Sequence, residues 1–109
     1  MAYELRYLPL FYRDFERAVR YIAFKLHNPE AAENLAAAIE QAIQRRLPVA
    51  EAFEKYQSRK HRSSPYYRIF VLNYMIFYVV LEGESGNKIM EVRRLLHQRQ
   101  NWKEILHVS

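Results

Sequence analysis

Ionisable side chains recur along the last apolar segment of the chain, where their spacing would let them act together. Strand alternation over residues 89–97 would place alternate residues on one side if the pairing is regular. The alternate residues are Glu91, Arg93, Leu95, His97 and Arg99. A carboxylate, arginines and a histidine on one side could bind a phosphodiester and transfer protons. The alternative is a cross-strand ladder of ion pairs, which would contribute little beyond solubility.

Arg68 is a second candidate because it opens the apolar segment 69–72 directly after two tyrosines. Its planar guanidinium group matches the geometry of a phosphate or a carboxylate. The alternative is that its aliphatic stem packs on the sheet while its charged head lies in water.

A basic segment precedes this arginine. Five of the eight residues from 55 to 62 can carry positive charge, namely Lys55, Arg59, Lys60, His61 and Arg62. Because the segment is expected to lie near the start of the strand that holds Arg68, the two together predict a positive surface suited to a nucleic-acid backbone. The alternative is a solvated run of charge with no ligand.

The chain lacks the residues that several other chemistries need. It has no cysteine, which excludes disulfides, thiolate metal sites and cysteine catalysis. The four histidines have no metal-ligand spacing, and no glycine-rich phosphate-binding loop is present. We therefore expect neither a metal nor any other cofactor.

Hydrophobic periodicity predicts the elements that must position these residues. A strand is expected over residues 3–10, with Pro9 at its end or on an edge. Helical spacing predicts helices over 13–27 and 29–47, with Asn28 as N-cap and Pro29 as the first helical residue. β-branched and aromatic residues predict strands within 66–81, joined by a turn at Asn73-Tyr74, and a strand over 89–97. A short helix is expected over 102–106.

The order β-α-α-β-β-β predicts an α+β fold. In this fold a helical hairpin packs on one face of a small antiparallel sheet, and the other face is left free to bind a partner. With 109 residues, half of them hydrophobic, we expect a single domain over residues 1–109.

The formal net charge of +5 suits a polyanionic partner, either a nucleic acid or an acidic protein. No apolar run reaches the roughly 18 residues of a transmembrane helix. The first residues also lack the apolar core of a signal peptide. These features predict a cytoplasmic location with no membrane partner.

Several segments, in this order, resemble the RelE/ParE superfamily of toxins from type II toxin–antitoxin modules. The similar segments are the opening strand and residues 28–35, 67–70 and 94–101, and the likeness spans nearly the whole chain, from Tyr3 to Leu106. The resemblance implies the RelE/ParE-like fold, growth inhibition of the kind used in plasmid stabilisation, and a cognate antitoxin as partner. Such an antitoxin would lay an acidic segment over the toxin.

The superfamily contains two activities. RelE-like members cut mRNA on the ribosome without a metal, and ParE-like members inhibit DNA gyrase without nuclease chemistry. If this chain resembles the nucleases, Arg68 and Arg99 would stabilise the scissile phosphate and His97 would transfer a proton. The nucleic-acid-binding side chains would then be Arg59, Lys60, Arg62, Arg93 and Trp102.

One departure from the RelE pattern concerns a functional tyrosine, which is absent from residues 100–105. Trp102 in that segment can stack on a base but cannot transfer a proton as a phenol does. Our first hypothesis is nevertheless a RelE-like mRNA interferase, a metal-independent endonuclease. The alternatives are a non-enzymatic ParE-like inhibitor of gyrase and a binding module that is no longer toxic.

Overall fold

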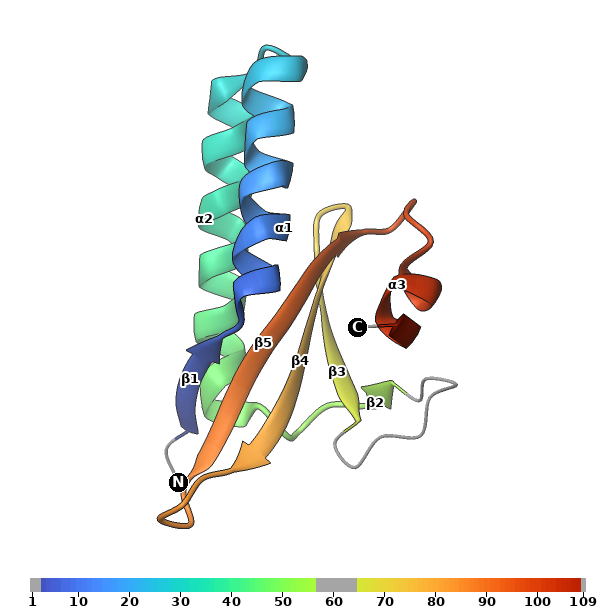
Figure 1. The fold of residues 1–109 in the computed structure, drawn as a ribbon. Helices are drawn as coiled ribbons and strands as arrows, with labels where there is room; N and C mark the ends of the chain where they lie inside the picture. The colour runs from blue at the N-terminus through green and yellow to red at the C-terminus, as the bar shows by residue number, and fades with distance from the viewer. Residues whose placement is uncertain (1–2, 57–64, 109) are drawn as a thin grey trace.

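The computed structural model describes residues 3–56 and 65–108 and shows helices on both sides of one sheet (Figure 1). The elements in chain order are β1 (Tyr3–Tyr7), α1 (Pro9–Arg20), the π-helical turn η1 (Tyr21–Lys25), α2 (Pro29–Arg46), the 3-10 turn η2 (Leu47–Val49), β2 (Lys55–Tyr56), β3 (Tyr66–Val71), β4 (Tyr74–Glu82), β5 (Lys88–His97) and α3 (Trp102–Val108). The predicted α+β class is therefore confirmed.

The five strands form one sheet in the order β1-β5-β4-β3-β2. The β3, β4 and β5 strands form an antiparallel meander, and the short β2 strand adds to β3. In contrast, β1 pairs with β5 in the parallel sense, with Tyr7 opposite Val92. The sheet is therefore mixed rather than purely antiparallel. The helical hairpin returns the chain so that β5, the last strand of the meander, runs alongside β1.

The helical hairpin begins earlier than the sequence predicts. Pro9 is the first residue of α1 and not the end of a strand. Its ring fixes a helical φ, and its missing N–H has no partner in a first turn anyway. The second boundary is confirmed, since the side chain of Asn28 accepts a hydrogen bond from the backbone N–H of Ala31 at 3.1 Å and α2 starts at Pro29.

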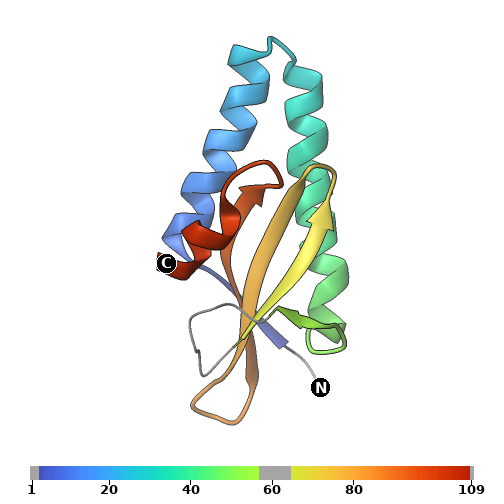
Figure 2. The same cartoon turned by 90° about the vertical axis from the view of Figure 1, so that its right-hand side faces the viewer.

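Side chains on the two faces of the sheet form two hydrophobic clusters. The cluster under α1 and α2 includes Leu35, Ile39 and Ile43, which are almost fully buried against the sheet. The cluster on the opposite face includes Phe77 and Leu106, both with no exposed surface. Figure 2 shows α3 in front of this second face. The expectation of a free second face is therefore wrong, because the apolar side of α3 covers part of it.

The β3–β4 turn lies one residue earlier than predicted. Val71 pairs with Tyr74, so the turn residues are Leu72 and Asn73. Leu72 adopts a φ of 53°, a left-handed conformation that two-residue hairpin turns require and that leucine rarely adopts. Among the described residues, no helix is long and apolar enough to cross a membrane.

Candidate functional site

A groove of about 470 Å³ lies between the hairpin and the end of the sheet, and we call it the α1–β5 groove. Side chains from two sides line it, including Arg17, Ala18, Tyr21, Tyr74, His97 and Arg99. Its floor is apolar, since Ala18 is 8% exposed and the neighbouring Leu95 is 2% exposed. The groove thus combines an apolar floor with two arginines on opposite walls.

His97 and Arg99 are brought together at the sheet side of this groove. The backbone N–H of Arg99 donates to Nδ1 of His97 at 3.0 Å, so Nδ1 acts as an acceptor. The imidazole ring contacts Tyr74 edge-on, with centroids 5.0 Å apart. Burial raises the pKa of the Tyr74 phenol, with a further contribution from nearby Tyr21. The Tyr74 phenol is therefore neutral at physiological pH.

Asp14 also lines the groove but does not give it a net negative charge. The carboxylate accepts hydrogen bonds from Nε and Nη2 of Arg94 at 2.8 and 3.0 Å, and from the backbone N–H of Leu95 at 2.9 Å. Asp14 is 8% exposed, so this charge is paired and shielded from solvent. By contrast, the side chains of Arg17 and Arg99 are exposed, and neither makes an ion pair with any residue that the structure describes.

Arg68 lies on the other face of the sheet among aromatic rings. Its guanidinium carbon is 5.0 Å from the ring centroid of Tyr56, 5.4 Å from that of Phe70 and 5.8 Å from that of Trp102. The Tyr56 and Trp102 rings also contact each other and Phe77 of the α3-side cluster. Arg68 is partly exposed, and its guanidinium group makes cation–π contacts with these rings.

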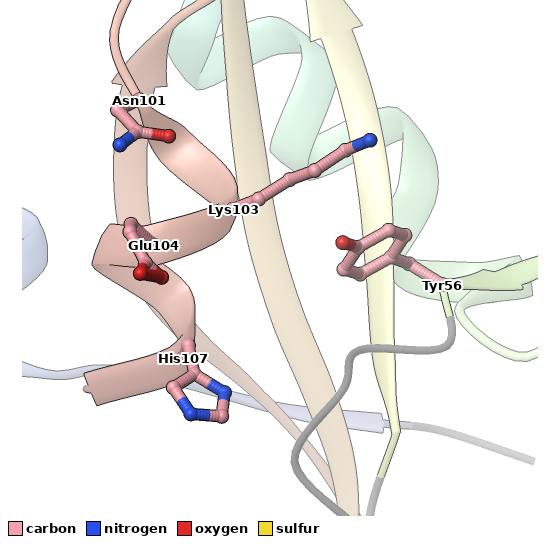
Figure 3. A pocket seen from close by; sticks show the side chains of 5 residues that line it. All are labelled: Tyr56, Asn101, Lys103, Glu104 and His107. Carbon is pink, nitrogen blue, oxygen red and sulfur yellow. The ribbon is translucent and has the colours of Figure 1, made fainter.

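A smaller hollow of about 290 Å³ adjoins this cluster beside α3 (Figure 3). Tyr56, Asn101, Lys103, Glu104 and His107 line it. The lining carries charges of both signs, and Lys103 also lies over the Trp102 ring at 5.6 Å. We therefore see no single ligand chemistry that this hollow favours.

The predicted one-sided row along β5 is divided between the two faces. Glu91 is 5% exposed and binds Nε of Arg93 at 2.9 Å and Nη1 of Arg6 at 3.2 Å. A register irregularity lies opposite Phe77 and Tyr78, where Arg93 is passed over in the pairing with β4. One extra residue reverses which face the following side chains occupy. Leu95 therefore belongs to the helix-side core, and His97 lines the groove on that same side.

The structure brings His97 and Arg99 together and separates both from Arg68. Trp102 lies with Arg68, and Arg93 is held in the ion pair with Glu91. The positions of Arg59, Lys60 and Arg62, and of His61, lie outside the described residues. Within the described residues, no three potential metal-ligating side chains gather at one place.

Two groove residues, Arg17 and Tyr21, were not identified as site residues from the sequence. Both lie on the stretch predicted as helix, where Arg17 belongs to its basic face. The available signal was a spacing of four residues, which places an arginine and an aromatic ring on the same helical face. That spacing could not show that the end of β5 lies opposite them.

A helical hairpin on one face of a five-stranded mixed sheet is the fold of RelE/ParE toxins. The family model for the ParE toxin of the type II toxin–antitoxin system parDE matches residues 5–102. The chain therefore belongs to the ParE toxin family, within the RelE/ParE superfamily. A comparison with curated proteins found no match. The protein is thus a type II toxin with a cognate antitoxin as its partner.

Proposed function

We propose that this toxin arrests growth by binding DNA gyrase and that it acts without cutting nucleic acid. The proposal rests on where three side chains lie. Arg68 is on the α3 side of the sheet, whereas His97 and Arg99 line the groove on the opposite side. Membership of the ParE toxin family supports the same conclusion.

The physical argument concerns distance. Phosphodiester cleavage needs the proton-transfer group and the charge-stabilising groups within about 3 Å of the reacting atoms. Side chains that leave a sheet on opposite faces point away from each other and cannot meet at one phosphate. The Arg68 guanidinium is also held against the rings of Tyr56, Phe70 and Trp102. These contacts suit a structural role better than binding of a scissile phosphate.

A metal-independent mRNA endonuclease is the second candidate, and one observation favours it. His97 and Arg99 line the same groove as Arg17, so a proton-transfer group and two cations share one surface. A nuclease built on these three residues would use a different set from the one that the resemblance implies, because Arg68 would take no part.

Two assays with purified toxin separate the candidates. We expect the toxin to inhibit supercoiling by purified DNA gyrase and to leave mRNA on translating ribosomes intact. The matched control is the same toxin bound to its antitoxin beforehand, which should leave gyrase active. Discrete cuts in the mRNA together with uninhibited gyrase would overturn the proposal, as would a toxin that affects neither target.

The variant H97A/R99A adds a direct test of nuclease chemistry. Loss of a general acid–base group or of a stabilising cation lowers a catalysed rate about 100-fold or more. If mRNA is cut by the wild-type toxin and this variant reduces cutting to that extent, the groove is a nuclease site and the gyrase proposal fails.

A further inference from the structure

An aromatic pocket of about 230 Å³ lies at the base of the helical hairpin, between β1, α1 and α2 (Figure 1). We call it the hairpin pocket. Aromatic rings form much of its lining, namely those of Tyr7, Phe11, Tyr12 and Phe15. The centroid of the Tyr7 ring lies 5.3 Å from that of Phe11 and 5.5 Å from that of Tyr12. Because typical ligand sites have volumes of roughly 300–1,000 Å³, this pocket suits one side chain or a molecule of similar size.

A carboxylate lies beside these rings on the α2 side of the pocket. Glu40 lines the pocket and makes no ion pair with any residue that the structure describes. Burial raises the pKa of the Tyr7 phenol, with further contributions from nearby Tyr12 and Glu40. The Tyr7 hydroxyl also has no hydrogen-bond partner in the described part of the chain. The pocket thus offers two acceptors, a carboxylate and a phenol oxygen, next to aromatic rings.

The charge of the hairpin pocket is opposite in sign to that of the chain as a whole. The chain has a formal net charge of +5, and the α1–β5 groove on another face of α1 carries Arg17 and Arg99. Aromatic rings attract cations to their faces, and Glu40 adds to this attraction while it repels anions. A neutral apolar ligand would displace water from the two acceptors without replacing its hydrogen bonds. A cation is therefore the ligand that uses both the rings and the carboxylate.

We propose that the hairpin pocket binds a guanidinium group carried on an alkyl stem. The stem packs on the buried side chains of Phe11 and Ile39, and the N–H groups donate to the carboxylate of Glu40 and the hydroxyl oxygen of Tyr7. A guanidinium group suits the pocket better than an ammonium group does, because it is planar and weakly hydrated and stacks on rings while its N–H groups bind a carboxylate. The proposal does not depend on the target that the toxin inhibits.

A titration of the purified toxin, followed by nuclear magnetic resonance, tests the proposal. The probe is n-butylguanidinium, and the matched control is n-butylurea, which has nearly the same shape and no charge. We expect the probe to bind with a Kd of about 1–10 mM, as is reasonable for so small a ligand, and to shift the resonances of Tyr12, Phe15 and Glu40. Butylurea should bind at least about tenfold more weakly, because it loses both the ion pair and the cation–π contact.

Two variants, each with a control on the same hairpin, test the residues that we assign. E40Q should weaken binding of butylguanidinium about fivefold, the upper range for an exposed ion pair, whereas E33Q removes another exposed glutamate of α2 and should have no effect. Y12L should weaken binding about threefold through loss of a cation–π contact. Its control is Y21L, since Tyr12 and Tyr21 are 56% and 53% exposed. Circular dichroism of each variant checks that the fold is retained.

A blocked tripeptide, Gly-Arg-Gly, distinguishes two sources of the guanidinium group. If it binds as tightly as butylguanidinium, the pocket accepts an arginine side chain of another protein. If the tripeptide fails to bind while butylguanidinium binds, the pocket accepts a free small cation. Both results support recognition of the guanidinium group.

Three results would overturn the proposal. One is butylurea binding as tightly as butylguanidinium, since the pocket would then recognise only the apolar stem. Another is equal affinity of E40Q and E33Q for the probe, and the third is the absence of saturable shifts at the pocket residues. Gyrase is absent from these titrations, so their failure leaves the gyrase proposal standing, and failure of the supercoiling assay leaves this proposal unaffected.

Discussion

Tyr78 of β4 is the residue at which the sheet, α2 and the segment after η2 are joined by hydrogen bonds. Its hydroxyl donates to the backbone carbonyl of Ala50 at 2.6 Å and accepts from Nη1 of Arg46 at 2.9 Å. The ring stacks on Tyr67 with centroids 5.1 Å apart and has no exposed surface. Nothing in the apolar run of β4 distinguishes this tyrosine from its neighbours in the sequence. Its hydrogen-bond partners lie about 30 positions earlier, and local sequence patterns do not reveal them.

Replacing Tyr78 with phenylalanine should lower the free energy of unfolding at pH 7 by about 1–3 kcal/mol, because it leaves buried hydrogen-bonding groups without a partner. Burial raises the pKa of the Tyr78 phenol, although Arg46 opposes the shift. A raised pKa means that the neutral phenol stabilises the fold fully below the unfolded-state pKa of about 10 and less as pH rises above it. Urea unfolding at pH 7 and pH 11 should therefore show a smaller gap between wild type and Y78F at the higher pH.

Tyr12 supplies the comparison, since its ring is 56% exposed and Y12F should change stability by less than about 0.5 kcal/mol. A difference between wild type and Y78F that stays constant to pH 11 would contradict the assigned cause.

At the scale of elements, one carboxylate of the first helix bonds to the last strand, in addition to the apolar packing between the two elements. The β1 strand ends at Tyr7, opposite Val92, and leaves the rest of the β5 edge without a strand partner on that side. Asp14 of α1 fills part of this gap by accepting the backbone N–H of Leu95 and the side chain of Arg94. The periodicity of α1 is visible in the sequence, but the partner of Asp14 lies 80 positions away and is not.

Asp14→Ala should lower the free energy of unfolding by about 3–5 kcal/mol, the typical result of removing one partner from a buried ion pair. Urea denaturation measures the loss, and Glu16→Ala on the exposed side of α1 is the matched control. Hydrogen exchange adds a local readout, since the Leu95 amide should exchange faster once its acceptor is removed. A loss below about 1 kcal/mol would show that this pair does not hold α1 to β5.

At the scale of the whole molecule, the two hydrophobic clusters share the strands of one sheet. The helix-side cluster uses Ile76 and Tyr78 of β4, and the α3-side cluster uses Met75, Phe77 and Val79 of the same strand. Loss of either cluster exposes a face of the strands that support the other. This sharing is the physical basis for the single domain expected over residues 1–109.

Thermal or urea unfolding followed by two signals tests this expectation. The chain has one tryptophan, Trp102, whose ring contacts Phe77 in the α3-side cluster, while far-ultraviolet circular dichroism is dominated by the helical hairpin. We expect the two transitions to coincide, as they do when a small domain unfolds in one cooperative step. A fluorescence change that precedes the loss of helicity would show instead that α3 detaches independently.

The sequence by itself determined the longer elements and their order, because hydrophobic period, proline and capping residues act within a few positions of where they stand. The two-residue strand β2 was not predicted. It also indicated the superfamily. It misplaced the start of α1, since Pro9 suits both the end of a strand and the first turn of a helix. It indicated that His97 and Arg99 could share a surface, and both line the α1–β5 groove. However, regular strand alternation also placed Arg93 on that surface, which the structure does not.

Only the tertiary structure decided which predicted residues meet. The irregularity between β4 and β5 reverses the face of His97 relative to Glu91 and Arg93, and a one-residue shift of this kind leaves no mark on composition or spacing. Packing of α3 on the second face of the sheet places Trp102 beside Arg68 and away from the groove. Such contacts depend on the free energy of burying surfaces that are distant in the chain, which local sequence patterns do not encode.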